Sequence, residues 1–153
     1  MGADAQPAPP HELRGAWIAT VLNLDWPASR TASVSRQKEA LVRTLDRLKA
    51  VGINAVFFQV RSEADALYAS DMEPWSYWLT GEQGQAPEPA YDPLRFVIEE
   101  AHKRGMELHA WLNPFRAVRP GSNYERAPGH VSVEHPEWLL QFDDGLKILN
   151  PGL

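Results

Sequence analysis

The feature that most constrains the fold is an almost wholly apolar run at residues 54–61, NAVFFQVR. A strand with one solvated face alternates apolar and polar residues, whereas a strand covered on both faces is apolar nearly throughout. Fully covered strands are typical of α/β proteins, in which helices pack over a parallel sheet. The run therefore predicts a central parallel strand that is covered on both faces.

Helices are predicted on either side of this strand. The first begins at a candidate N-cap, Ser33 or Ser35, and ends at Gly52. The second begins with Asp92 and a first-turn proline, and it ends at Gly105. Helical periodicity predicts that the inward residues are Leu41, Leu45, Leu48, Leu94, Val97, Ile98 and Ala101.

Two further apolar segments, residues 14–21 and 106–113, predict strands. The resulting order, strand–helix–strand–helix–strand, indicates a parallel sheet with right-handed crossovers, in either a doubly wound fold or a barrel. The first strand is not followed by G-x-G-x-x-G, which disfavours a dinucleotide-binding fold. Residues 62–91 and 114–144 are predicted as long loops after strand carboxyl ends, where such folds carry their active sites.

The sequence after these loops predicts a turn at residues 143–145 and another short extended segment at 146–149. Residues 1–13 are predicted to be a disordered leader, because they are rich in Ala and Pro and lack the charged and apolar regions of a signal peptide. Residues 14–153 are then one domain.

Composition excludes several classes of function. A net charge of −5 with mixed signs disfavours nucleic acid as a partner. The chain has no cysteine, which excludes a disulfide framework, a thiol nucleophile and a zinc–thiolate site. No apolar run is long enough to span a membrane. Neither the pair His130 and His135 nor the pair His102 and His109 has the spacing of a known metal motif, so no metal is expected.

Polar side chains gather where the predicted strands end. Alternation places Gln59 and Arg61 on one side of the second strand, and His109, Trp111 and Asn113 on one side of the third. Amide, guanidinium and indole groups suit a polyhydroxylated ligand, because sugar hydroxyls form hydrogen bonds and sugar CH faces stack on indole. An internal hydrogen-bond network is an equally strong interpretation for any one of these residues.

Carboxylates are present, but none forms a compelling catalytic pair. Glycosidic cleavage uses two carboxyl groups, roughly 5–10 Å apart. Asp65 is predicted to pair with Arg61 if the loop begins helically. The candidates are Asp25, Glu63, Asp65, Asp71, Asp143 and Asp144.

Five motifs together resemble the glycosyl-hydrolase-like 10 family, and the similarity covers essentially everything from Arg14 onward. They are RGAWIATVLNLDWP (14–27), FFQVRSEADALYASDMEPWSYWLTGEQG (57–84), YDPL (91–94), ELHAWLNPFR (107–116) and LNPG (149–152). The resemblance implies a (β/α)₈ barrel in bacterial envelope, periplasmic or secreted proteins. It also implies a glycoside hydrolase that acts without an organic cofactor, in some members on the glycan strands of peptidoglycan.

The resemblance further implies that family members continue with more strands, one of which ends in a pair of aspartates thought to be catalytic. We therefore expect this chain to be the N-terminal portion of a barrel, with three to four βα units, unidentified catalytic residues and no turnover of its own. Open sheet edges would favour self-association. The alternatives are a non-catalytic carbohydrate-binding or wall-scaffolding module and, less favoured, a purely structural α/β domain.

The residues that the resemblance places toward substrate come from all three strand ends and the loops after them. Four of the tryptophans, at positions 26, 75, 78 and 111, are expected to form a platform for sugar rings. The full set of expected substrate-binding residues is Asn23, Asp25, Trp26, Gln59, Arg61, Asp65, Tyr68, Trp75, Trp78, His109, Trp111, Asn113 and Arg116.

Overall fold

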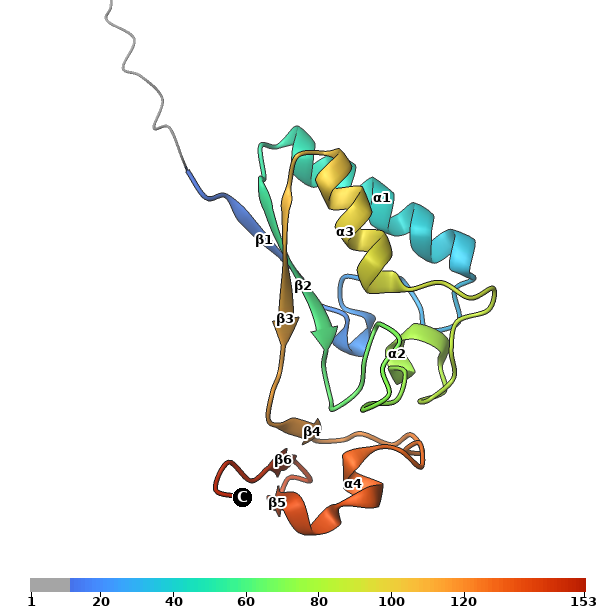
Figure 1. Ribbon diagram of the computed structural model, residues 1–153, viewed down its shortest axis with the longest axis vertical. Helices are drawn as coiled ribbons and strands as arrows, with labels where there is room; N and C mark the ends of the chain where they lie inside the picture. The colour runs from blue at the N-terminus through green and yellow to red at the C-terminus, as the bar shows by residue number, and fades with distance from the viewer. Residues whose placement is uncertain (1–11) are drawn as a thin grey trace, which may run out of the picture.

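A parallel sheet of three strands forms the centre of the computed structural model, which describes residues 12–153. The strands are β1 (Gly15–Ile18), β2 (Ala55–Arg61) and β3 (Glu107–Leu112), and they lie side by side in chain order (Figure 1). The predicted parallel sheet is confirmed, although β1 is shorter than expected. After Ile18 the chain turns into a 3-10 segment, η1 (Val21–Asn23).

Two long helices connect these strands, as predicted. The helix α1 (Val34–Ala50) is capped by Ser33 rather than Ser35, and α3 (Pro93–Lys103) is capped by Asp92, whose side chain accepts from the N–H of Arg95 at 2.9 Å. Gly52 follows the first helix with φ +84°, a left-handed conformation that favours glycine and stops the helix.

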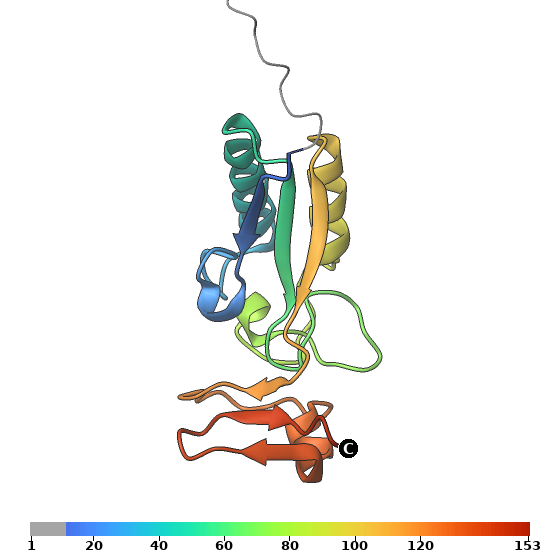
Figure 2. The same cartoon turned by 90° about the vertical axis from the view of Figure 1, so that its left-hand side faces the viewer.

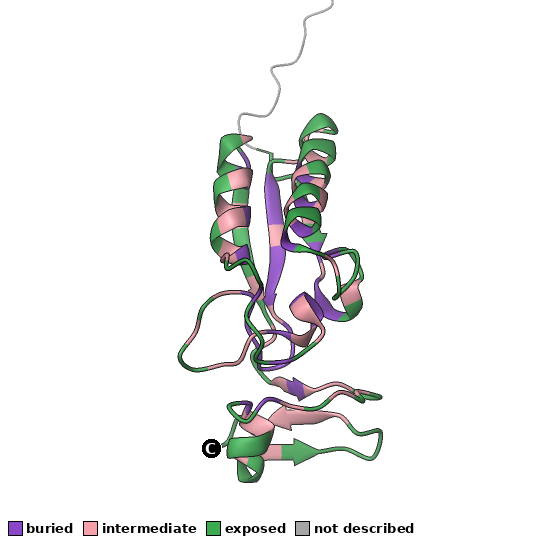
Figure 3. Cartoon of the chain, turned by 90° about the vertical axis from the view of Figure 1, so that its right-hand side faces the viewer, coloured by how far each residue is buried: buried purple, intermediate pink, exposed green. Residues whose placement is uncertain are grey.

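Both helices pack on the same face of the sheet (Figure 2). Right-handed crossovers between strands in sequential order require this, and the arrangement occurs both in (β/α)₈ barrels and in each half of a doubly wound sheet. The hydrophobic core lies between the helices and the sheet, where β2 is the most buried strand (Figure 3). Its main members are Ile18, Leu41, Leu45, Val56, Phe58, Val60, Val97, Ala101 and Met106. Leu48, Leu94 and Ile98, also predicted inward, are half-buried.

Among residues 12–153, no helix lies over the other face of the sheet, so helices cover β2 on one face only and the face with Phe57 stays open. Aromatic rings from neighbouring strands lie there in register. Trp17, Phe57 and His109 stack across the three strands with ring centroids 4.8 Å apart at each step, and Trp111 meets Trp17 edge-on at 4.9 Å. The rings cover one another, which makes an apolar strand possible without a second layer of helices.

The segment predicted as a loop over residues 62–91 follows β2. It contains a short helix, α2 (Tyr77–Thr80), and an isolated bridge between Ala66 and Trp75. Much of this segment is buried, including Glu63 and Leu79. It therefore acts as part of the core rather than as a surface loop.

The segment predicted as a loop over residues 114–144, together with the extended segment predicted after it, folds into a second, antiparallel sheet with the order β4-β6-β5. Its elements are β4 (Arg116–Val118), α4 (Val131–Glu134), the 3-10 turn η2 (Pro136–Trp138), β5 (Leu139–Gln141) and β6 (Lys147–Leu149). The predicted turn at 143–145 and the extended segment after it are confirmed. However, β6 pairs antiparallel with β4 and β5, so it is not a fourth strand of the parallel sheet.

The predicted leader lies outside the described residues up to position 11. Glu12, the first described residue, accepts a hydrogen bond from Asn54 Nδ2 through its main-chain oxygen at 2.6 Å. None of the helices between residues 12 and 153 is both long and apolar enough to cross a membrane. Over the same range, no three His, Asp or Glu side chains are grouped so that they could hold a metal ion.

Candidate functional site

The candidate site lies at the carboxyl ends of β1, β2 and β3, where the segment after β2 meets the segment after β3 (Figure 1). We call this edge the rim. Most of the residues predicted from sequence lie here, because parallel strands end on the same side of the sheet. Their hydrogen-bond partners decide which of them remain available to a ligand.

Gln59 shapes the turn after β1. Its side chain is fully buried, and Oε1 accepts from the main-chain N–H groups of Thr20 at 2.9 Å and Val21 at 3.0 Å. Its Nε2 is buried with no hydrogen-bond partner among the described residues. Gln59 therefore joins two strand ends and retains one unused donor.

Arg61 pairs with Glu73, so the predicted pair with Asp65 is wrong. Its Nε donates to both carboxylate oxygens of Glu73, at 2.7 and 2.9 Å, and its Nη1 donates to the main-chain oxygen of Asn113 at 2.5 Å. Tyr68 lies beside this pair. Burial first, and then the charge of Glu73, raise the pKa of its phenol.

Asp65 instead stabilises the turn that follows β2. Its Oδ1 accepts from the N–H and hydroxyl of Ser62, at 3.2 and 3.1 Å, and from the N–H of Glu63 at 3.0 Å. Ala64, between them, has φ +51°, a left-handed conformation that costs energy for a residue with a Cβ. The carboxylate of Asp65 offsets that cost by satisfying the N–H groups of the turn.

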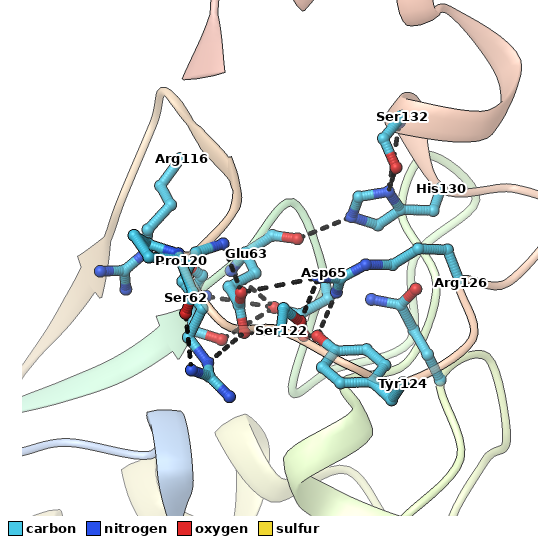
Figure 4. Close-up of polar contacts among 12 residues, drawn as sticks. Ser62, Glu63, Asp65, Arg116, Pro120, Ser122, Tyr124, Arg126, His130 and Ser132 are labelled. Atoms are coloured by element: carbon cyan, nitrogen blue, oxygen red, sulfur yellow. Dashed lines mark hydrogen bonds and ion pairs between the residues drawn. The ribbon is translucent and has the colours of Figure 1, made fainter. Parts of the chain in front are cut away.

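Glu63 is the centre of a buried polar cluster that the sequence did not reveal (Figure 4). Its carboxylate accepts from Trp78 Nε1 at 3.0 Å, from the main-chain N–H of Arg119 at 2.9 Å and from the Tyr124 hydroxyl at 3.3 Å. The guanidinium groups of Arg119 and Arg126 each lie 3.8 Å from it.

The main chain of Glu63 belongs to the same cluster. Its carbonyl oxygen lies 2.8 Å from Nε2 of His130, which is fully buried. Burial is the main cause that lowers the pKa of His130, and burial raises the pKa of Tyr124, with a further contribution from the Glu63 charge. We call Glu63, Trp78, Arg119, Tyr124, Arg126 and His130 the Glu63 cluster. Of these residues, Glu63, Trp78 and His130 were considered from the sequence, each for a different role, whereas Arg119, Tyr124 and Arg126 were not.

Two of the four predicted platform tryptophans are core residues, which corrects that prediction. Trp26 is 1% exposed, and its indole N–H donates to the main-chain oxygen of Gln37 at 2.8 Å. Trp78 is 4% exposed and donates to Glu63. Each ring lies in the interior with its one polar atom satisfied, so neither can stack on a sugar. Trp75 is half-buried against the core.

Trp111 is half-buried on the open face of the sheet, and its Nε1 donates to Asn113 Oδ1 at 2.8 Å. Trp17, which sequence reasoning did not select, lies against it and is 61% exposed. These two indoles lie together on the open face, Trp17 exposed and Trp111 half-buried.

The other predicted residues are engaged in local hydrogen bonds. Asn23 donates to the main-chain oxygen of Trp78 at 2.8 Å, Asp25 accepts from the N–H of Ala19 at 2.7 Å, and His109 lies 3.1 Å from Glu107. Both Asn113, at 3.4 Å, and Arg116, at 3.0 Å, donate to the main-chain oxygen of Ser62. A role in binding substrate stays a prediction for all of them.

The rim carries amide, guanidinium and indole groups, and each of its described carboxylates makes internal contacts, although Oδ2 of Asp65 is buried without a hydrogen-bond partner among the described residues. Asp25 and Asp65 accept main-chain N–H groups, whereas Glu63 and Glu73 lie against arginines. A glycosidase needs one carboxyl group that can donate a proton and another that faces the sugar. Residues 12–153 do not present such a pair at the rim.

Comparison with known proteins identifies the family. The family model described as "Glycosyl hydrolase-like 10" matches residues 12–152. The chain is 43% identical over 143 residues to the glycosyl hydrolase YngK of Bacillus subtilis, covering 93% of this chain and 28% of YngK. It is 41% identical over 157 aligned residues to the glycosyl hydrolase DigH of Escherichia coli K12, covering 92% of this chain and 35% of DigH.

Among solved structures, the chain is similar to an alpha-amylase from Lactobacillus plantarum, with a TM-score of 0.43 and 16% identity over 92% of this chain and 32% of that one. The chain spans about a third or less of the length of the curated relatives it matches. With nearly all of its described residues matched by the family model, the chain belongs to the glycosyl hydrolase-like 10 family.

Proposed function

We propose that this chain forms the N-terminal, sugar-binding part of a (β/α)₈-barrel glycoside hydrolase, with the catalytic carboxylates supplied by other residues of the whole protein. Membership of the family and the names of the relatives, both glycosyl hydrolases, support hydrolysis of an O-glycosyl bond. The share of the relatives that the chain covers supports a division of the site between this chain and further residues.

The observation that carries the proposal is the set of groups at the rim and on the open face beside it. The half-buried indole of Trp111 contacts the exposed indole of Trp17 and donates to the amide of Asn113. The main-chain oxygen of Asn113 accepts in turn from the guanidinium of Arg61. Rings stack on the CH face of a sugar, while amides and guanidinium groups bind its hydroxyls. In barrels this edge faces the substrate.

The substrate that we propose is a glycan of the bacterial cell wall or a related polysaccharide, which would place the protein in the periplasm, the cell envelope or outside the cell. The family resemblance is the support for this finer assignment. The rim itself supports the chemical class, a polyhydroxylated chain, because it carries amide and guanidinium groups beside aromatic rings.

A second candidate is a non-catalytic carbohydrate-binding or wall-scaffolding module. The observation that favours it is the engagement of Asp25, Glu63, Asp65 and Glu73 in internal contacts. Both proposals require a sugar at the rim. They differ in whether the whole protein cleaves it.

Calorimetric titration of chitooligosaccharides and of peptidoglycan glycan strands, with mass spectrometry of the mixtures, tests the proposal. We expect the chain to bind without releasing products. Trp17→Ala or Trp111→Ala should weaken binding about 2- to 10-fold, since aromatic stacking contributes about 0.5–1.5 kcal/mol.

Trp138→Ala is the matched control, because Trp138 is also an exposed indole but lies beyond the rim, in the 3-10 turn η2 that precedes β5. Equal affinity for all four proteins would contradict a sugar site at the rim. Products that disappear in Asp25→Asn or Asp65→Asn would show instead that this chain holds its own catalytic acid.

A further inference from the structure

The Glu63 cluster joins the segment after β2 to the segment after β3, alongside the stacking of Tyr124 on Tyr77 at 3.9 Å and a hydrogen bond from the Ala127 N–H to Gln83 Oε1 at 3.1 Å. Beyond Arg116, the segment after β3 contacts Glu63 through four residues, Arg119, Tyr124, Arg126 and His130. The three that share a hydrogen bond with Glu63, namely Arg119, Tyr124 and His130, lie 56 to 67 positions from it in the chain. Figure 4 shows the side chains of Tyr124, Arg126 and His130 converging on the turn after β2. Neither sheet hydrogen-bonds to the other.

The charges in this cluster make Glu63 hard to replace. Its carboxylate is fully buried, while the side chains of Arg119 and Arg126 are 19% and 11% exposed. A partly buried guanidinium depends on a neighbouring negative charge, and removing one partner from a buried group of charges leaves the other uncompensated. A neutral side chain at position 63 would leave both guanidinium groups without this carboxylate.

We infer that Glu63 is a positioning residue that holds the antiparallel sheet over the rim, and that it thereby sets the shape of the sugar site without touching sugar. Only the second half of this inference, that Glu63 sets the shape of the sugar site, rests on the proposed function. Arg116 and Asn113 hydrogen-bond to the carbonyl of Ser62, directly beside Glu63. Release of the segment after β3 would therefore also displace rim residues expected to bind hydroxyls.

The test compares Glu63→Gln with the unchanged chain by hydrogen exchange, resolved by segment, at concentrations where each protein elutes as one species. We expect amides in residues 116–149 to exchange about a hundredfold faster or more, and amides in 55–60 to keep their rates. Glu100→Gln is the matched control. Glu100 also has two cationic partners, Lys103 at 2.5 Å and Arg104 at 2.7 Å, but it lies on α3. Glu100→Gln should leave the exchange rates of amides in residues 116–149 unchanged.

Unchanged exchange rates in residues 116–149 of Glu63→Gln would overturn the inference. An equal rise in residues 55–60 would also overturn it, because a loss of protection in both segments would make Glu63 an ordinary core residue. If Glu63→Gln does not fold, Arg126→Met and Tyr124→Phe are judged by the same two criteria. Glycan titration of the same variants separates the proposed sugar-binding function from the role of Glu63. If the unchanged chain binds no glycan, the proposed function fails, while the exchange result still decides the role of Glu63.

Discussion

The two faces of the parallel sheet differ sharply, although they are built from the same strands. Phe58 points toward the helices and is fully buried, whereas its neighbour Phe57 points to the open face and is half-buried. On the helix side, β2 packs against Leu41, Leu45 and Val97. On the open side, Phe57 is stacked between Trp17 and His109.

This difference teaches that apolar character does not by itself reveal what covers a strand. A helix layer removes water from a side chain completely, while a row of aromatic rings removes it only in part and leaves flat, exposed surface. Such surface is available to sugar rings, to other residues of a longer protein or to another copy of the chain. The three predictions that follow separate the two faces, or the two sheets, experimentally.

The largest expected effect is on the helix-covered face. Phe58→Ala should lower the free energy of unfolding by about 3–5 kcal/mol, because it opens a cavity in a packed core. Phe57→Ala should cost only about 1–2 kcal/mol, through lost ring stacking. Urea unfolding followed by circular dichroism measures both. Equal losses would mean that the open face is as well packed as the core.

A smaller effect is expected on self-association, which we expect to occur through the open face and the outer edges of β1 and β3. We expect the chain to form dimers or larger species at micromolar concentration. Trp17→Lys should weaken association about tenfold or more, since it places a charge in the exposed aromatic row. Size-exclusion chromatography with light scattering measures this. A monomeric chain with a sharp, cooperative melt would refute the idea.

The smallest expected effect is a loss of stability at acid pH through His130, which contacts the main chain of Glu63. Burial lowers the pKa of His130 below its ordinary value of 6.5. The unfolded chain therefore takes up this proton first, so the stabilising contribution of His130 is complete above pH 6.5 and falls as the pH drops toward the folded-state pKa.

The loss can reach at most about 1.4 kcal/mol for each unit by which the pKa is lowered. Melting temperatures of the chain and of His130→Gln, measured from pH 8 to pH 5, should show a shallower dependence in the variant. His102→Gln is the control, because His102 is exposed on α3. An identical dependence in all three proteins would show that His130 does not contribute.

The sequence by itself determined the local elements of this protein. Caps at Ser33 and Asp92 and stops at Gly52 and Gly105 define the two long helices, since each signal acts within one helical turn. The parallel sheet followed from strand–helix alternation, and the location of the rim followed from the direction of its strands. Family membership was also readable, because long ordered motifs do not depend on the fold being known.

Only the tertiary structure decided which residues at the rim are free. Trp26 and Trp78 resemble Trp111 in sequence context, yet they are buried, because helix α1 and the Glu63 cluster supply partners for their indole N–H groups. Arg61 selected Glu73 rather than Asp65, and Glu63 gathered donors from a distant segment. Pairings of this kind depend on where the folded chain brings together residues that lie 11 to 56 positions apart, and no local pattern encodes them.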